Sequence, residues 1–198
     1  ENIITFTVAD SIGQAFIDTI TITYAPESNG VLSCGNNLLV GVTDNLSSEG
    51  SMNSNVWKAF RWQATSNGTA NCVKLNVVRM TGDQSSKDLA YAVYEDSNGE
   101  VGNLMVSGTT LSYNWETIGS GMHSFLLNTV HTNRNIENGK WYWIALPTET
   151  NRDLWFERAS NSAALKRGTL FESYTIIPSG SSFTVNYANN NYGWSVWE

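Results

Sequence analysis

Residues 140–146 read KWYWIAL, and this run decides the fold class of the chain. Successive side chains of a β-strand point to opposite faces of the sheet, so Trp141 and Trp143 share one face. Tyr142 and Ile144 point to the other face, and both faces are therefore apolar. A strand that is apolar on both faces is typical of the centre of a β-sandwich, covered on both sides. We therefore expect these rings to lie mainly in the core.

Further strand-like runs occur along the rest of the chain. They are short, rich in β-branched and aromatic residues and bounded by Gly and Asn turns, whereas helical periodicity is weak. The predicted strands cover residues 56–65, 70–80, 89–95, 104–110, 124–132, 140–146, 153–157, 169–177 and 192–197. Because strands do not alternate with helices, this pattern predicts an all-β fold, an antiparallel β-sandwich or barrel.

The N-terminal residues carry a hairpin signal of their own. Two alternating β-branched runs, 4–8 and 16–24, are joined by a turn-like DSIG segment, and the PESNG segment at 26–30 then breaks the pattern. We predict a β-hairpin over residues 1–26 and a β-sandwich module over 27–198. Because an isolated hairpin is only marginally stable in water, we expect residues 1–25 to pair with a neighbouring domain or subunit.

Charged residues are scarce and mostly acidic. They make up 15% of the 198 residues, and 11 basic against 18 acidic residues give a net charge of −7. No basic stripe is present to neutralise phosphates, so nucleic acid and anionic membrane surfaces are poor partners. No apolar run approaches the roughly 18 residues of a membrane span, and we expect a soluble segment, either processed or cut from something longer.

The two cysteines, Cys34 and Cys72, do not form a CxxC pair, and no histidine cluster stands near them to complete a zinc site. In an exported protein they would form one disulfide, which is worth about 2 to 4 kcal/mol. Two buried reduced thiols are the other interpretation, and the sequence favours neither.

Catalytic signatures are missing from the sequence. The GxGxxG, GxxxxGK, HExxH and GxSxG motifs do not occur. His123 and His131 lie within or beside strand-like runs, where a structural role is expected. We therefore predict that the chain is not an enzyme and has no catalytic residue. A glycoside hydrolase or lyase that uses dispersed loop carboxylates is a third alternative.

The turn at residues 96–100 is the most concentrated candidate for a cation site. Asp96, Asn98 and Glu100 offer oxygen ligands of the kind calcium prefers, although a full EF-hand loop is absent. Asn-Gly also suits the left-handed positions of a hairpin turn, and we favour that interpretation. A calcium ion held here would be structural, and we expect no other cofactor.

Aromatic residues are unusually frequent, with eight Trp and eight Tyr. Exposed rings beside amide and hydroxyl side chains suit sugars, because the C–H face of a pyranose stacks on a ring while its hydroxyls form hydrogen bonds. Candidates for such a platform lie at strand ends or beside Asn-rich loops. They are Trp57, Tyr113, Trp115, Trp155, Tyr192, Trp194 and Trp197.

Part of the chain resembles a known family. The segments SNGTANCVKL (66–75), AVYEDSNGEVGNL (92–104) and NGKWYWIA (138–145) are similar to a jelly-roll β-sandwich domain of secreted bacterial and archaeal surface proteins. That family typically carries a strand ending in vaIYsDsnGxPGxLL and a later aGtYWLAv strand, and Val101 stands here where the family usually has Pro. The resemblance covers residues 45–198, and the hairpin from 5 to 24 resembles the last two strands of an immunoglobulin-like repeat.

The resemblance implies a jelly-roll-like fold and an extracellular or cell-surface location. Domains of this kind occur beside carbohydrate-active modules, adhesive repeats and cell-surface anchors. Together with the aromatic excess, it predicts a non-catalytic extracellular module that binds a polysaccharide or glycan. The alternative is a structural cell-surface, adhesin or filament subunit that assembles by β-strand addition through the N-terminal segment.

Overall fold

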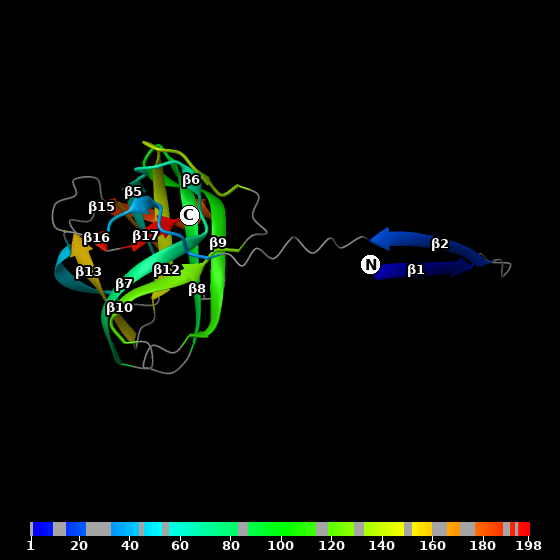
Figure 1. Ribbon diagram of the computed structural model, residues 1–198, viewed down its shortest axis with the longest axis horizontal. Helices are drawn as coiled ribbons and strands as arrows, with labels where there is room; N and C mark the ends of the chain where they lie inside the picture. The colour runs from blue at the N-terminus through cyan, green and yellow to red at the C-terminus, as the bar shows by residue number, and fades with distance from the viewer. Residues whose placement is uncertain are drawn as a thin grey trace. The chain divides into compact units, whose positions relative to one another are not determined.

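The computed structural model describes residues 2–9, 15–22, 33–43, 46–52, 56–82, 87–113, 119–128, 133–148, 152–159, 166–170, 177–187, 191–192 and 194–198. In these ranges the chain forms antiparallel strands and one short 3-10 helix, η1 (Gly180–Ser182), which confirms the predicted all-β class (Figure 1). The chain divides into two compact units, Glu1–Leu32 and Ser33–Glu198. In the described part of the chain, no helix has the length and apolar character that a membrane span requires.

The first unit is a two-stranded antiparallel hairpin. It consists of β1 (Asn2–Ala9) and β2 (Ala15–Ile22). Ile4 lies opposite Ile20, and Thr5 lies opposite Thr19. The alternating residues of the two runs thus come into register, which confirms the predicted hairpin.

The second unit contains a six-stranded sheet in the order β15-β14-β5-β12-β8-β9. Its strands are β5 (Val56–Gln63), β8 (Lys87–Ser97), β9 (Glu100–Tyr113), β12 (Trp141–Thr148), β14 (Lys166–Leu170) and β15 (Thr184–Tyr187). The KWYWIAL run opens β12, which lies between β5 and β8. Its two apolar faces therefore predicted a central strand correctly.

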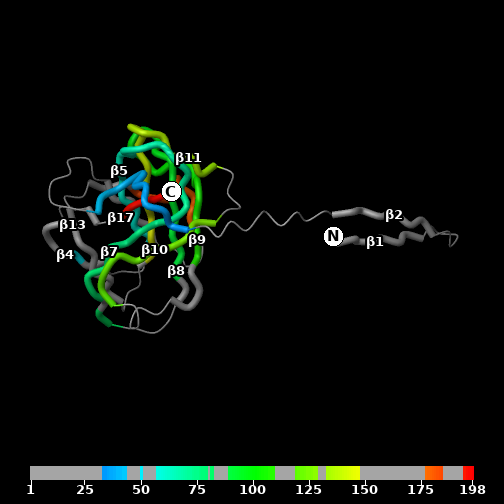
Figure 2. The backbone as a smooth tube through the Cα atoms, viewed as in Figure 1, coloured from blue at the N-terminus to red at the C-terminus, as the bar shows by residue number. Residues whose placement is uncertain are grey.

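A seven-stranded sheet forms the other large sheet of this unit, with the order β16-β13-β7-β17-β3, β10 paired with β7 and β4 paired with β13. Its strands are β3 (Leu38–Gly41), β4 (Leu46–Met52), β7 (Cys72–Gly82), β10 (Gly121–Leu126), β13 (Arg152–Ala159), β16 (Asn191–Tyr192) and β17 (Trp194–Trp197). Two further short strands, β6 (Gly68–Thr69) and β11 (Asn135–Ile136), pair with each other. Figure 2 shows β7 and β10 running side by side.

One buried cluster joins the two large sheets. Phe60 of β5 meets Trp194 of β17 with ring centroids 4.8 Å apart. Tyr91 of β8 meets Phe125 of β10 with centroids 5.5 Å apart. Because each pair takes one ring from each sheet, the two sheets share this core.

A second buried cluster lies on the opposite face of the six-stranded sheet. β12 contributes to both clusters, since Tyr142 and Ile144 belong to the shared core while Trp143 and Ala145 belong to the second cluster. Phe183, which follows η1, packs into the second cluster as well. This is why both faces of the KWYWIAL run are apolar.

A disulfide joins Cys34 to Cys72, with the Cα atoms 5.4 Å apart. Cys72 is the first residue of β7 and is fully buried, and Cys34 precedes β3. The structure thus selects the disulfide over two reduced thiols, the alternatives that the sequence left open.

Several elements differ from the sequence-based expectation, since β3, β4 and β15 were not predicted and β10 covers Gly121–Leu126 where a strand was expected at 124–132. The predicted loop between residues 95 and 104 shrinks to a tight turn, in which Asn98 has φ 54° and Gly99 has φ 90°. Positive φ at both central residues is the conformation for which Asn-Gly is favoured, so β8 and β9 extend almost to the turn. The strand β4 was missed because its sequence, LSSEGSM, is mostly polar and poor in β-branched residues.

Candidate functional site

A cavity of about 580 Å³ opens where β8 ends and β12 begins, and we call it the strand-end cavity. Its lining combines an indole, a phenol, two amides, three carboxylates, an ammonium group and a thioether. The residues are Glu95, Asp96, Met105, Asn133, Asn135, Glu137, Lys140, Trp141 and Tyr142.

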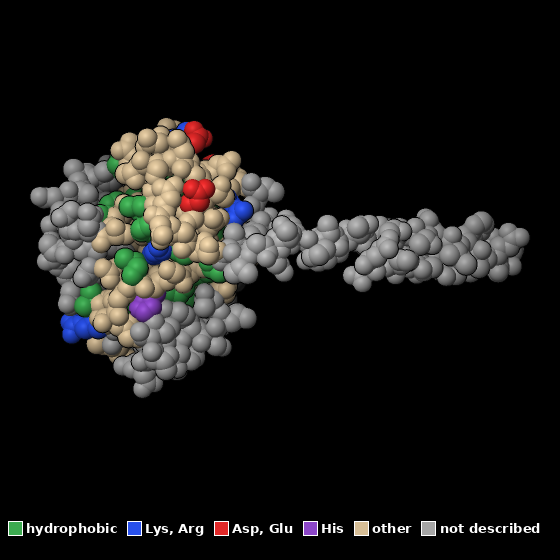
Figure 3. Space-filling view, in the orientation of Figure 1, with side chains coloured by type: hydrophobic (Ala, Val, Ile, Leu, Met, Phe, Trp, Pro, Cys, Tyr) green, Lys and Arg blue, Asp and Glu red, His purple; other side chains and the backbone are tan. Residues whose placement is uncertain are grey.

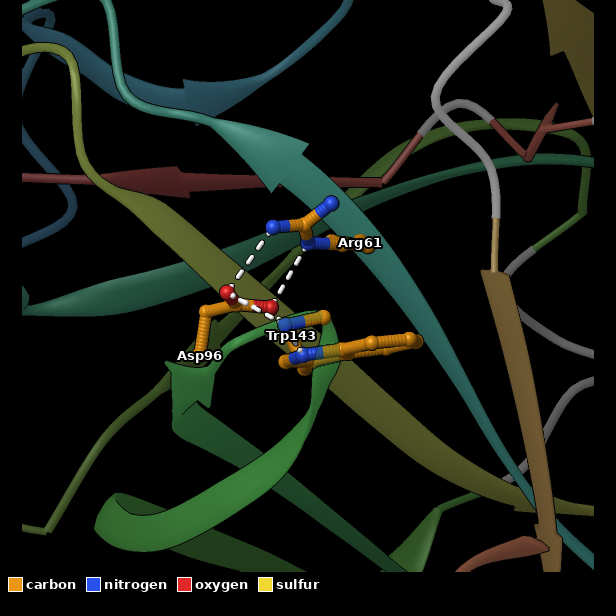
Figure 4. A network of polar contacts seen from close by, with 4 residues as sticks. Arg61, Asp96 and Trp143 are labelled. Carbon is orange, nitrogen blue, oxygen red and sulfur yellow. Dashed lines mark hydrogen bonds and ion pairs between the residues drawn. The ribbon is translucent and has the colours of Figure 1, made fainter. Parts of the chain in front are cut away.

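Asp96 is the centre of a polar network at the wall of this cavity (Figure 4). Its carboxylate accepts hydrogen bonds from Arg61 Nε at 2.6 Å and from Arg61 Nη2 at 2.8 Å. The Trp143 indole N–H donates to it at 2.9 Å, and the Gly99 amide donates at 3.0 Å. Four donors fill the acceptor positions of one carboxylate, so Asp96 is fixed in place.

The network also positions Trp141. The guanidinium carbon of Arg61 lies 4.3 Å from the centroid of the Trp141 ring, a cation–π contact. Because Asp96 holds the guanidinium with two hydrogen bonds, the ring packs against a rigid partner. We expected the KWYWIAL rings to lie mainly in the core, and Tyr142 and Trp143 do so. Trp141 is different, because it is only half-buried and lines the strand-end cavity.

Glu95 lies beside this wall and is held by amides. Its Oε1 accepts a hydrogen bond from Asn133 Nδ2 at 3.1 Å, and its Oε2 accepts one from Asn103 Nδ2 at 3.3 Å. Asn133 itself lines the cavity. Amide donors and a carboxylate acceptor are thus already arranged for hydrogen bonding around the opening.

Glu137, the third carboxylate of the described cavity lining, is paired with Lys140. Lys140 Nζ donates to Glu137 Oε1 at 2.7 Å, and this hydrogen bond raises the pKa of the Lys140 ammonium group. The Glu137 amide donates to the Tyr142 hydroxyl at 2.9 Å. Burial raises the pKa of Tyr142, so this hydroxyl stays protonated at neutral pH.

The predicted aromatic platform is not assembled from the rings that the structure describes. Trp57 and Trp194 are fully buried, because each fills one of the two core clusters, and neither presents a face to solvent. Trp197 is half-buried, and Lys74 Nζ covers its ring at 3.7 Å from the centroid. The strands that carry Tyr113, Trp155 and Tyr192 are described but these side chains are not, and Trp115 lies outside the described residues.

Among the side chains that the structure describes, the exposed large hydrophobic ones belong to β10 of the seven-stranded sheet. Met122 and Leu126 of β10 are 42% and 45% exposed. In the view of Figure 3, hydrophobic side chains form small patches separated by polar surface. Scattered apolar residues of this kind are normal on a protein surface and do not by themselves mark a site.

The calcium candidates occupy a hairpin turn. The oxygens of Asp96 are engaged by the donors described above, and Asn98 and Glu100 are exposed. Among the side chains that the structure describes, no group of three His, Cys, Asp or Glu gathers around a metal-sized position. The turn interpretation of this segment accounts for the backbone that we observe.

The histidines lie away from the strand-end cavity or outside the described residues. His123 is part of β10, where its Nε2 lies 3.0 Å from the Gly119 carbonyl oxygen, and burial lowers its pKa. His131 lies outside the described residues.

No protein-family model and no curated protein sequence matches this chain.

Proposed function

We propose that residues 33–198 form a non-catalytic module that binds a glycan in the strand-end cavity. The observation that carries this proposal is the placement of Trp141, a half-buried indole at the cavity wall whose orientation Arg61 and Asp96 fix. A rigid ring of this kind can stack on the C–H face of a sugar with little loss of conformational entropy.

The polar lining supports the same ligand chemistry. Asn133, Asn135 and the carboxylates of Glu95 and Glu137 surround the opening with hydrogen-bond donors and acceptors. Sugar hydroxyls both donate and accept, so they pair with amides and carboxylates alike. Pockets for small ligands typically combine an apolar surface with a few such polar groups.

The state of the carboxylates supports binding rather than hydrolysis. Glycosidases need one carboxyl group as an acid and a second as a nucleophile or base. Here Asp96 is saturated by four donors and Glu137 is paired with Lys140. Among the described carboxylates of the cavity lining, this leaves Glu95 without a matching second carboxylate, which favours a non-catalytic role.

The disulfide supports an extracellular or cell-surface location. Disulfides form and persist mainly in oxidising compartments, which include the exterior of the cell. The likeness of residues 45–198 to jelly-roll domains of secreted surface proteins points the same way. Neighbouring domains or subunits would then attach through residues 1–25.

Replacing Trp141 with alanine is expected to weaken glycan binding at least tenfold, because truncating a central Trp typically costs about 2 kcal/mol or more. Isothermal titration against a panel of neutral polysaccharide fragments would measure the change. Trp197→Ala is the matched control, since it removes a half-buried Trp on the other sheet. If Trp197→Ala abolished binding while Trp141→Ala kept it, the ligand would bind at Trp197 on the seven-stranded sheet, and the proposed site would be wrong.

A structural role is the second candidate function. It is favoured by the separate two-stranded unit, because no third strand pairs with β1 or β2 in the described part of the chain. Unpaired strand edges readily accept a strand from another chain. If this candidate is right, light scattering will show concentration-dependent polymers that disappear when residues 1–32 are removed. A monomer that is unchanged by the truncation would contradict it.

A further inference from the structure

The charges of the strand-end cavity do not cancel. Three carboxylates line it, those of Glu95, Asp96 and Glu137. Arg61 neutralises Asp96 from behind the wall, with a shortest N–O distance of 2.6 Å. Lys140 neutralises Glu137 at 2.7 Å. Among the described lining residues, Glu95 therefore carries the one charge that no ion pair balances.

The donors to Glu95 are neutral. Asn133 and Asn103 donate to its two oxygens, and no described Lys, Arg or His side chain forms an ion pair with it. Amide donors hold the carboxylate in position but leave its negative charge in place. Lys140 also attracts Glu95 electrostatically, but its ammonium group already pairs with Glu137, and the whole chain has a net charge of −7.

We infer that the strand-end cavity takes neutral or amine-bearing glycans and rejects acidic ones such as uronate or sulfated polymers. This inference rests on the proposed function and names its ligand class. A neutral sugar can donate hydroxyl protons to Glu95, and an ammonium group can form an ion pair with it. A carboxylate or sulfate on the ligand would meet a fixed like charge instead, which is an effective means of excluding a wrong partner.

The expected size of the discrimination follows from Coulomb's law. Two like charges about 5 Å apart weaken binding by a factor of about 250 when the effective dielectric constant is about 20, as near a protein surface, and by a factor of about 4 in bulk water. We therefore expect an acidic glycan to bind at least about tenfold more weakly than its neutral counterpart at low salt. The difference should shrink as salt screens the repulsion.

The test compares glycans that share one backbone. Hydroxyethyl cellulose, galactomannan and a β-1,3-glucan are each run in affinity electrophoresis beside their own C6-oxidised forms, in which a hydroxyl has become a carboxylate. The proteins are the full chain, Glu95→Gln and Glu100→Gln. The last variant removes the same charge from the exposed hairpin turn without changing the cavity lining.

The full chain should bind the neutral form at least tenfold more tightly than the oxidised form. In Glu95→Gln this ratio should fall below about threefold, whereas Glu100→Gln should keep it. Equal binding of both forms by the full chain, or an unchanged ratio in Glu95→Gln, would overturn the inference and leave the proposed function standing. If no polysaccharide in the panel binds in either form, the proposed function fails and this inference fails with it.

Discussion

Replacing Asp96 with alanine is expected to lower the free energy of unfolding of the second unit by about 3 to 5 kcal/mol, the usual cost of removing one partner of a buried ion pair. The side chains of Arg61 and Asp96 are only 17% and 10% exposed, so water cannot readily replace the lost carboxylate. The variant also leaves the indole N–H of Trp143 and the amide of Gly99 without their acceptor.

Urea unfolding followed by tryptophan fluorescence would measure this loss as a lower transition midpoint. Glu137→Ala is the matched control, since it breaks the exposed ion pair with Lys140 and should leave the midpoint nearly unchanged. In a double-mutant cycle, Arg61→Leu combined with Asp96→Ala should cost less than the sum of the single changes. Equal midpoints for Asp96→Ala and Glu137→Ala would show that the network does not stabilise the fold.

Removing the disulfide is expected to destabilise the second unit by about 4 kcal/mol. Cys34 and Cys72 are 38 residues apart, and closing a loop of that length restricts the unfolded chain by about this amount in the chain-entropy model. The bond also ties the residues before β3 to the buried start of β7, so its loss should loosen this part of the seven-stranded sheet first.

The measurement compares urea unfolding of the oxidised chain, the chain with reductant, and the Cys34→Ser/Cys72→Ser double variant. The reduced chain and the double variant should unfold at similar, lower urea concentrations. Reductant should have no further effect on the double variant, which serves as the control. An oxidised chain that unfolds at the same midpoint as its reduced form would contradict the prediction.

Much of the strand content could be predicted from local patterns. The alternation in the KWYWIAL run identified a strand covered on both faces, because each face of β12 meets its own buried cluster. The Asn98-Gly99 pair identified a hairpin turn, because its preference for positive φ is a property of the two residues themselves. The polar strand β4 has no such local signal. This segment forms a strand because it pairs with β13.

The candidate site could not be predicted in the same way. Alternation places Trp141 on the same face as Trp143, and on that basis both were assigned to the core. Trp143 is buried. Trp141 lies two residues earlier, at the start of β12, where it borders the strand-end cavity and packs against Arg61. The signal that could have separated them is the position of Trp141 next to the Asn138-Gly139 turn, which marks the start of the strand.

Side-chain alternation and turn preferences, which act between neighbours in the chain, were enough to establish an all-β protein with a leading hairpin and a doubly covered central strand. The pairing of Arg61 with Asp96, of Cys34 with Cys72 and of Glu95 with Asn133 joins residues 35, 38 and 38 positions apart. Such contacts depend on which strands become neighbours and on where the cover of each sheet face ends. Trp57 and Trp194 are buried in the tertiary structure, whereas Trp141 borders a cavity. The local pattern could not separate these rings, because burial is a property of the packed sheets.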